Sequence, residues 1–150
     1  MKQTPQGTGI TEMYITAEHL RDQVIRPTLE YLGVWSEDTE RELLAGALRR
    51  SEAGLGLRRA TGLGLFRITS AQHRDLWDRY LAFRPDIASK VRGLASQRAF
   101  LTNPDSELQT NLSYCTAIAW VMRQRETANT DWEQAHRTRP LRVTSQVAHA

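Results

Sequence analysis

The residues of this chain best placed to do chemistry are Glu52 and the polar pair Asn111 and Tyr114. Glu52 ends a predicted buried helix, and a glycine-rich stretch follows it before the next predicted helix begins. A glutamic acid can donate a proton near neutral pH when an apolar, partly desolvated pocket raises its pKa. Asn111 and Tyr114 are three residues apart and therefore share one helical face. The sequence thus offers one candidate general acid and two polar side chains on one helical face.

The elements that would position these residues are predicted to be helices within residues 16–125. Helix starts are indicated by N-cap residues at Thr16, Ser36 and Thr69, and by a proline in the first turn at Pro85 and Pro104. Gly33 ends the first predicted helix, which Pro27 should kink or interrupt. Apolar side chains recur at helical spacing along five predicted helices, and we expect these to be buried: Leu20, Val24, Leu29 and Leu32; Leu43, Leu44, Ala47 and Leu48; Leu76, Trp77, Tyr80 and Leu81; Ile87, Val91 and Leu94; Leu108, Leu112, Cys115, Ala119 and Met122.

The rest of the chain lacks this helical period. Residues 1–15 read as an extended N-terminal arm, and residues 51–68, with four glycines, as a loop or a pair of short extended strands. Residues 126–150 are predicted to form a C-terminal tail that is disordered or is ordered by a partner. The predicted fold class is therefore mainly α, with a glycine-rich loop or short hairpin, an arm and a tail.

Composition excludes several classes of protein. A chain of 150 residues with 40% hydrophobic and 25% charged positions fits one domain with its own core. The single cysteine excludes an internal disulfide. No apolar stretch approaches the roughly 18 residues of a membrane span, and residues 1–15 lack a secretory pattern. We therefore expect a protein without a membrane span, made in the cytoplasm.

Charge is distributed unevenly along the chain. Residues 1–40 hold 3 basic and 7 acidic side chains, residues 41–98 hold 12 and 5, and residues 99–150 hold 5 and 5. Only Lys2 and Lys90 are lysines, so arginine, which contacts carboxylate or phosphate bidentately, dominates. DNA phosphate is therefore a possible partner, although no zinc-finger, basic-zipper or RNP-type motif accompanies the charge.

Other site chemistries find little support. The glycines do not fit a phosphate loop, and the four histidines lack metal-ligand spacing, so we expect no metal and no cofactor. Cys115 lies on an apolar helical stripe, which favours a buried thiol over a nucleophile. Asp75 and Asp78 are more typical of a solvated helix face than of a second catalytic carboxylate. Three aromatic residues are expected in the core rather than on a sugar-stacking surface: Trp77, Tyr80 and Phe83.

The order of these features resembles the lysozyme-like fold of lytic transglycosylases, and most closely the transglycosylase-like proteins of bacteriophages. The resemblance covers residues 17–125. It is carried by Glu52-Ala53 at a helix end, by the segment GLFRIT at 64–69, by Asn111-Leu112-Ser113-Tyr114 on a later helix, and by Pro27 and Trp35 in the first helix and the turn after it.

The resemblance implies a peptidoglycan-cleaving site with one catalytic glutamate. Glu52 would protonate the glycosidic oxygen, and the sugar's own hydroxyl would close onto the anomeric carbon. Arg67, Asn111 and Tyr114 would bind the substrate.

The chain departs from the family pattern at its site. Ala53 replaces a serine, Arg67 replaces a glutamine, and no A-Y-N segment follows Tyr114. Arginines at 49, 50, 58 and 59 bracket Glu52 in sequence, and nearby cations lower the pKa of a carboxyl, whereas a general acid needs it raised. Glu52 is therefore either a retained acid or a remnant that ties the helix end to the loop. Asn111 and Tyr114 are either site residues or helix-packing polar groups.

Three functions follow from these interpretations. The first is a bacteriophage virion structural or assembly protein on a degenerate transglycosylase-like scaffold, synthesised in the bacterial cytoplasm and present in the virion. As such it would be a homo-oligomer in contact with tail, portal or ejection proteins. The second is an active virion-associated lytic transglycosylase that cleaves peptidoglycan during genome entry. The third is a DNA-contacting packaging or ejection factor that uses its arginines.

Overall fold

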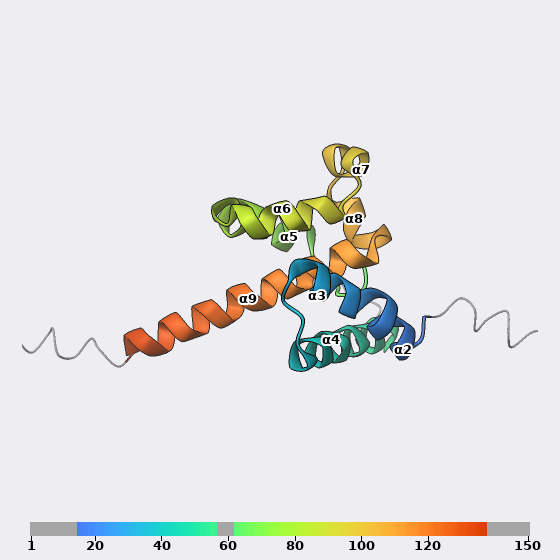
Figure 1. Cartoon of the computed structure of the whole chain (residues 1–150), viewed down its shortest axis with the longest axis horizontal. Helices are drawn as coiled ribbons and strands as arrows, with labels where there is room; N and C mark the ends of the chain where they lie inside the picture. Colours follow the sequence, from blue (N-terminus) through green and yellow to red (C-terminus); the bar gives the residue numbers. More distant parts are fainter. Residues whose placement is uncertain (1–14, 57–61, 138–150) are drawn as a thin grey trace, which may run out of the picture. The chain divides into compact units, whose positions relative to one another are not determined.

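A computed structural model describes residues 15–56 and 62–137 (Figure 1). These residues are mainly helical, which confirms the predicted fold class; the lysozyme-like detail stays a prediction. Within the two ranges the extended backbone pairs only at one antiparallel bridge, between Leu63 and Ile68. The chain divides into two compact units, Met1–Ala119 and Trp120–Ala150. Residues 1–14 of the predicted arm and 138–150 of the predicted tail lie outside the described residues.

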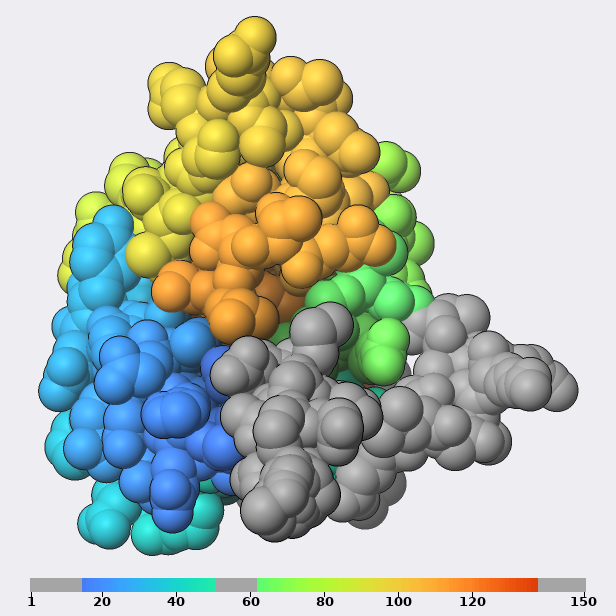
Figure 2. Space-filling view, turned by 90° about the vertical axis from the view of Figure 1, so that its right-hand side faces the viewer, coloured from blue at the N-terminus to red at the C-terminus, as the bar shows by residue number. Residues whose placement is uncertain are grey.

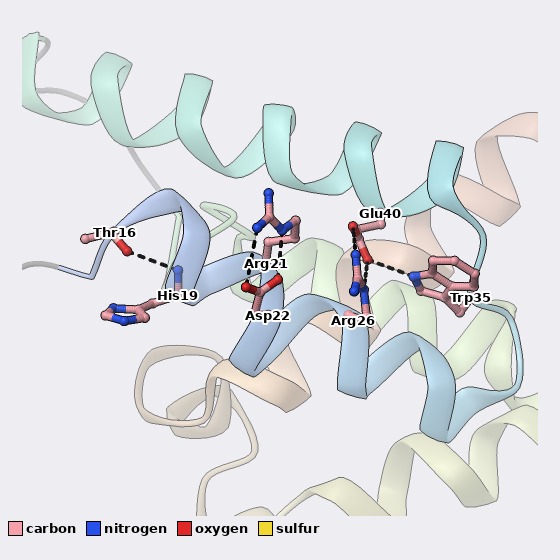
Figure 3. Close-up of polar contacts among 7 residues, drawn as sticks. All are labelled: Thr16, His19, Arg21, Asp22, Arg26, Trp35 and Glu40. Atoms are coloured by element: carbon pink, nitrogen blue, oxygen red, sulfur yellow. Dashed lines mark hydrogen bonds and ion pairs between the residues drawn. The ribbon is translucent and has the colours of Figure 1, made fainter.

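The first helical segment contains a wider turn just before its proline. It consists of α2 (Ala17–His19), the π-helical η1 (Leu20–Ile25) and α3 (Arg26–Leu32). Thr16 caps its start by accepting a hydrogen bond from the His19 N–H at 3.0 Å, as predicted (Figure 3). Pro27 has no N–H and cannot complete an ordinary helical turn, and the π-turn ahead of it accommodates the missing bond, so the segment continues. Gly33 ends it with φ of 78°, in the left-handed region.

Helix α4 (Glu37–Gly56) lies beside η1 and is tied to α3 by an ion pair. Ser36 caps its start through the Thr39 N–H. Glu40 is buried, and Arg26 donates to its two carboxylate oxygens at 2.6 and 2.8 Å (Figure 3). The Trp35 indole N–H donates to the same carboxylate at 2.7 Å. These bonds fix the turn between the two helices.

The second half of the first unit begins with the turn at 62–68 and α5 (Ser70–Arg79). The predicted capping box of Thr69 and Gln72 is present, with both reciprocal hydrogen bonds formed. Helices η2 (Leu81–Phe83) and α6 (Pro85–Leu94) follow, and α6 contacts α3. Three further helices complete the described chain: α7 (Gln97–Thr102), α8 (Asp105–Thr110) and α9 (Leu112–Arg137).

Two helical predictions differ from the structure in this half. The long helix predicted to start near Asn103 is divided at Asn111, whose backbone is extended between α8 and α9. The short helix α7, capped by Ser96, was not predicted, because its six residues carry too few apolar positions for a helical period.

The core of the first unit draws on nearly every helix. Figure 2 shows one face, on which α8 and the start of α9 (orange) lie between the first helices (blue) and α7 (yellow). Three side chains predicted to be buried are exposed: Leu48 at 40%, Leu112 at 39% and Phe83, at the η2 turn, at 74%. Six others are half-buried: Leu44, Trp77, Tyr80, Ile87, Leu94 and Met122. A helical period gives the direction of a face, but the width of the covered stripe depends on which neighbours pack against it. The fully buried large side chains of this unit are Tyr114, Leu20, Ile25, Leu29, Leu43, Leu76, Leu81, Leu108, Ile118, His73 and Val91.

The second unit contains the C-terminal part of α9. The helix continues to Arg137, beyond the position near Arg125 where the apolar period weakens. From Glu126 to Arg137 every side chain is exposed. This part of the predicted tail, which was expected to be disordered or ordered by a partner, is therefore helical. No helix of the described ranges is long and apolar enough to cross a membrane.

Candidate functional site

Tyr114 lies at the centre of a hydrogen-bonded cluster built by α5, α8 and α9, which is buried at Tyr114 and His73 and exposed at Ser70. Its side chain is fully buried, and its hydroxyl lies 2.7 Å from Nε2 of His73 and 2.9 Å from Nε1 of Trp77. On the other side of the His73 ring, Nδ1 lies 2.8 Å from an Asp105 carboxylate oxygen. The second Asp105 oxygen accepts a hydrogen bond from Ser70 at 2.6 Å. We call these five residues the Tyr114 cluster: Ser70, His73, Trp77, Asp105 and Tyr114.

The donors and acceptors of the cluster fix the direction of its bonds. The Trp77 indole can only donate, so the Tyr114 oxygen accepts from it. The Asp105 carboxylate accepts from Ser70 and from His73 Nδ1–H. A neutral His73 then has its lone pair at Nε2, which accepts the Tyr114 hydroxyl proton. In this arrangement every polar hydrogen of the chain from Trp77 to Asp105 has an acceptor.

Burial and hydrogen bonding shift the pKa values of the two acidic groups in opposite directions. Burial raises the pKa of the Tyr114 hydroxyl well above its ordinary value, so this group stays protonated. Burial also opposes ionisation of Asp105, but the bonds from His73 and Ser70 outweigh it and hold the Asp105 pKa below its usual range. The cluster therefore joins an ionised carboxylate to a neutral phenol through an imidazole.

Aromatic rings close the cluster on its outer side. The Phe100 ring of α7 meets Trp77 edge-on at 5.6 Å and Tyr114 at 6.2 Å between centroids. The Arg92 guanidinium stacks on Phe100 at 4.0 Å. Edge-to-face ring contacts of this kind add packing energy beyond the buried area.

Asn111 connects the loop between α8 and α9 to α6. Its side-chain amide donates to the Leu94 carbonyl at 2.9 Å and to the Glu107 carboxylate at 2.8 Å. Its side-chain oxygen accepts the Tyr114 N–H at 2.9 Å and so caps α9. Both amide hydrogens and the oxygen are thus used inside the protein. The geometry favours the helix-packing interpretation of Asn111 and Tyr114 over a role in contacting substrate.

Arg67 lies on the glycine-rich turn, apart from these internal bonds. Its side chain is exposed and its φ is 53°, the one positive value at a non-glycine residue in the described ranges. Gly64 on the same turn has φ of 71°, and a Cβ there would lie 1.9 Å from the Leu108 carbonyl oxygen. The turn is therefore pressed against α8, and the Leu63–Ile68 bridge holds Arg67 at its outer corner.

Cys115 lies beneath this turn as a buried thiol. Burial raises the pKa of its thiol, although the backbone N–H groups of Phe66 and Leu65 partly oppose that effect. A protonated, inaccessible thiol is a packing group and not a nucleophile, in agreement with the sequence-based expectation.

Glu52 lies in α4, four residues before its end, and its side chain is outside the described residues. Arg58 and Arg59 lie outside them as well, whereas Arg49 and Arg50 are exposed on α4. The proposed acid function of Glu52 therefore stays a prediction. Asp78 is exposed, and Asp75 is half-buried and pairs with Arg79 on the same helix at 3.2 Å.

Sequence reasoning did not bring His73, Asp105 and Ser70 together with Tyr114. A partial signal was present, because Ser70, His73 and Trp77 are spaced by three and four residues and therefore share one face of α5. The partners on that face come from positions 32 to 41 residues away, which no local pattern specifies.

The described part of the chain contains no cluster of three or more His, Cys, Asp or Glu side chains arranged to hold a metal ion. Comparison with protein-family models, with curated protein sequences and with solved structures gives no match for this chain.

Proposed function

We propose that this protein is a structural or assembly component of a bacteriophage particle, built on a helical scaffold that does not cleave peptidoglycan. In this role it binds other particle proteins and further copies of itself. The scaffold is proposed to derive from a lytic-transglycosylase-like domain, on the order and spacing of the motifs at Glu52, 64–69 and 111–114.

The observation that carries the proposal is the internal use of Asn111 and Tyr114. A side chain that binds a sugar must present free donors and acceptors to a cleft. The Tyr114 hydroxyl is buried and bonded to His73 and Trp77, and the Asn111 amide is bonded to α6, α8 and α9. Of the three proposed substrate-binding residues, Arg67 alone keeps an exposed side chain. This arrangement supports a scaffold whose polar groups stabilise the fold.

The absence of catalysis is tested with purified protein and isolated bacterial cell walls. We expect no release of soluble peptidoglycan fragments by the wild-type chain or by Glu52→Gln, measured beside an active muramidase. Digestion by the wild-type chain that is lost in Glu52→Gln would overturn the proposal in favour of an active lytic transglycosylase.

The particle role is tested by incorporation. A chain ending at Arg125 retains the buried residues of the core but lacks the exposed end of α9. We expect it to fold and yet to be absent from purified particles when it replaces the full-length chain in an infected host. Normal incorporation of the shortened chain would contradict the assignment of the C-terminal segment to assembly.

A further inference from the structure

The arginines of the first unit differ in whether a carboxylate neutralises them. Near the start of the chain, Arg21, Arg26 and Arg41 each form an ion pair, with N–O distances of 2.8, 2.6 and 2.9 Å (Figure 3 shows the first two). Between residues 62 and 102, Arg79 pairs with Asp75. The other arginines of that range form no ion pair within the described part of the chain: Arg67, Arg74, Arg84, Arg92 and Arg98.

The net charge of these two parts of the unit has opposite sign. Residues 15–56 hold five basic and eight acidic side chains, whereas residues 62–102 hold seven basic and three acidic ones. The later part therefore carries a positive charge that its own carboxylates do not compensate. Such an excess of guanidinium groups favours a polyanion as the partner.

Two of the unpaired guanidinium groups are held flat against aromatic rings. The Arg84 Cζ atom lies 3.7 Å from the centre of the Tyr80 ring, and the Arg92 Cζ atom lies 4.0 Å from that of Phe100. Arg84 also donates to the Tyr80 carbonyl at 3.2 Å. The rings cover one face of each guanidinium, so its N–H groups, which lie in its plane, can still bind a phosphate in the bidentate way typical of arginine. Because the groups are already held in place, binding costs them little conformational freedom.

Both groups lie on the side of α6 that faces α5 and α7. Tyr80 ends α5 and Phe100 belongs to α7, so the stacking contacts fix this direction. The side of α6 that carries Lys90 packs instead on α3. A helical rise of 1.5 Å per residue separates the Cα atoms of Arg84 and Arg92 by about 12 Å, roughly three to four phosphate intervals of a nucleic-acid strand. One short strand can therefore contact both arginines.

An exposed aromatic ring directly precedes the first of these arginines in the chain. Phe83, at the η2 turn, is 74% exposed. Proteins that bind single-stranded nucleic acid combine cationic side chains, which follow the phosphates, with aromatic rings on which unpaired bases stack. An acidic protein would use the guanidinium groups but not the ring, and the bases of a duplex are already stacked on one another. Phe83 therefore favours a single strand over either of these partners.

We propose that the surface formed by Phe83, Arg84 and Arg92 binds single-stranded nucleic acid. Arg84 and Arg92 bind phosphate groups, and a base stacks on the Phe83 ring. This binding is a property of the purified chain and goes beyond the proposed particle role, which the incorporation experiment tests separately.

Fluorescence anisotropy with a labelled single-stranded oligothymidine tests the phosphate contacts. We expect the full-length wild-type chain to bind at low ionic strength, with an affinity that falls as salt is added. The double variant Arg84→Gln/Arg92→Gln should bind about tenfold or more weakly, and its log–log salt slope should be smaller by about 1.4, since each phosphate contact to a single strand contributes about 0.7.

The matched control for these contacts is Arg21→Gln/Arg41→Gln. It removes the same number of charges, but from exposed arginines that are already paired with carboxylates. We expect its affinity for the oligothymidine to change little. Absence of binding by the wild-type chain at low ionic strength, or equal weakening in the two double variants, would overturn the proposal.

The stacking contact is tested by Phe83→Ala, a change at an exposed position that should leave the fold intact. We expect it to weaken oligothymidine binding about fivefold or more, whereas Trp132→Ala, which removes an exposed ring from α9, should not. A duplex of the same length should bind more weakly than the single strand. Wild-type affinity in Phe83→Ala, or tighter binding of the duplex, would contradict the proposal. Displacement of the oligothymidine by polyglutamate as effectively as by unlabelled oligothymidine would instead assign the surface to an acidic protein.

Discussion

The Tyr114 hydroxyl is both a donor and an acceptor in the core, and its loss leaves one buried and one half-buried group without a partner. In Tyr114→Phe the His73 Nε2 atom and the Trp77 indole N–H both lose their hydrogen bond. An unsatisfied buried polar group costs about 1–3 kcal/mol. We therefore expect Tyr114→Phe to lower the free energy of unfolding by at least that amount, measured by urea denaturation.

Tyr31→Phe is the matched control for this prediction. The Tyr31 hydroxyl also makes one hydrogen bond, to the Lys90 carbonyl, but the side chain is half exposed and water can replace the lost partner. We expect a loss of less than about 1 kcal/mol for this variant. Equal losses in the two variants would mean that the Tyr114 cluster adds nothing beyond an ordinary surface bond.

Arg67 stores backbone strain at the outer corner of the glycine-rich turn. Its φ of 53° lies in the left-handed region of backbone conformation. This conformation lowers stability by about 1–2 kcal/mol for an L-residue with a Cβ and by little for glycine. Both Arg67→Gly and Arg67→Ala remove the guanidinium, but only Arg67→Gly also removes the Cβ. We expect the glycine variant to be the more stable of the two by about 1 kcal/mol in thermal or urea unfolding. An alanine variant as stable as the glycine variant would show that the turn relaxes without this strain.

At the scale of elements, the ion pair between Arg26 and Glu40 couples α3 to α4 in a pH-dependent way. The bond from Arg26 holds the pKa of the buried Glu40 carboxyl below its ordinary value. A group whose pKa is lower in the folded state stabilises the fold above its unfolded pKa, about 4.3 for glutamate, and this stability is lost as pH falls through the folded value.

We therefore expect Glu40→Gln to destabilise the protein at pH 7 by a few kcal/mol, since Arg26 and Trp35 lose a charged acceptor. The difference from the wild-type chain should shrink as pH falls below about 4. Glu30→Gln, which changes an exposed carboxylate on α3, is the control and should shift stability little at either pH. If Glu40→Gln lowers the free energy of unfolding by the same amount from pH 7 to pH 3, the ionisation of Glu40 is not linked to stability.

The break in the predicted long helix at Asn111 also depends on contacts with neighbouring helices. An asparagine between two helical stretches can continue the helix or cap the next one. Here the Leu94 carbonyl of α6 and the Glu107 carboxylate of α8 both accept from its amide, which leaves its oxygen for the Tyr114 N–H. The sequence pattern around 103–125 is helical in either case, so only the approach of α6 selects the break.

At the scale of the whole molecule, the two units contribute unequally to stability. The buried apolar residues of the described chain end at Val121, so residues 126–150 add no described side chain to the core. We expect a chain ending at Arg125 to unfold in one transition with a free energy within about 0.5 kcal/mol of the full-length value, since exposed positions away from special features contribute little.

Circular dichroism and urea titration of the shortened and full-length chains check this expectation. Helical signal should fall in proportion to the residues of α9 that are removed. A large loss of stability would mean that the exposed end of α9 supports the core.

The sequence by itself determined the helical class, the helix starts at Thr16, Ser36, Thr69 and Pro85, and the buried thiol, because caps and helical periods are local properties. Tertiary structure decided the rest. It exposed Phe83, divided the chain at Asn111, and joined His73 and Asp105 to Tyr114, because hydrogen bonds and burial between distant segments depend on which helices meet. Such meetings arise from the packing of complete helices, and no single stretch of sequence contains them.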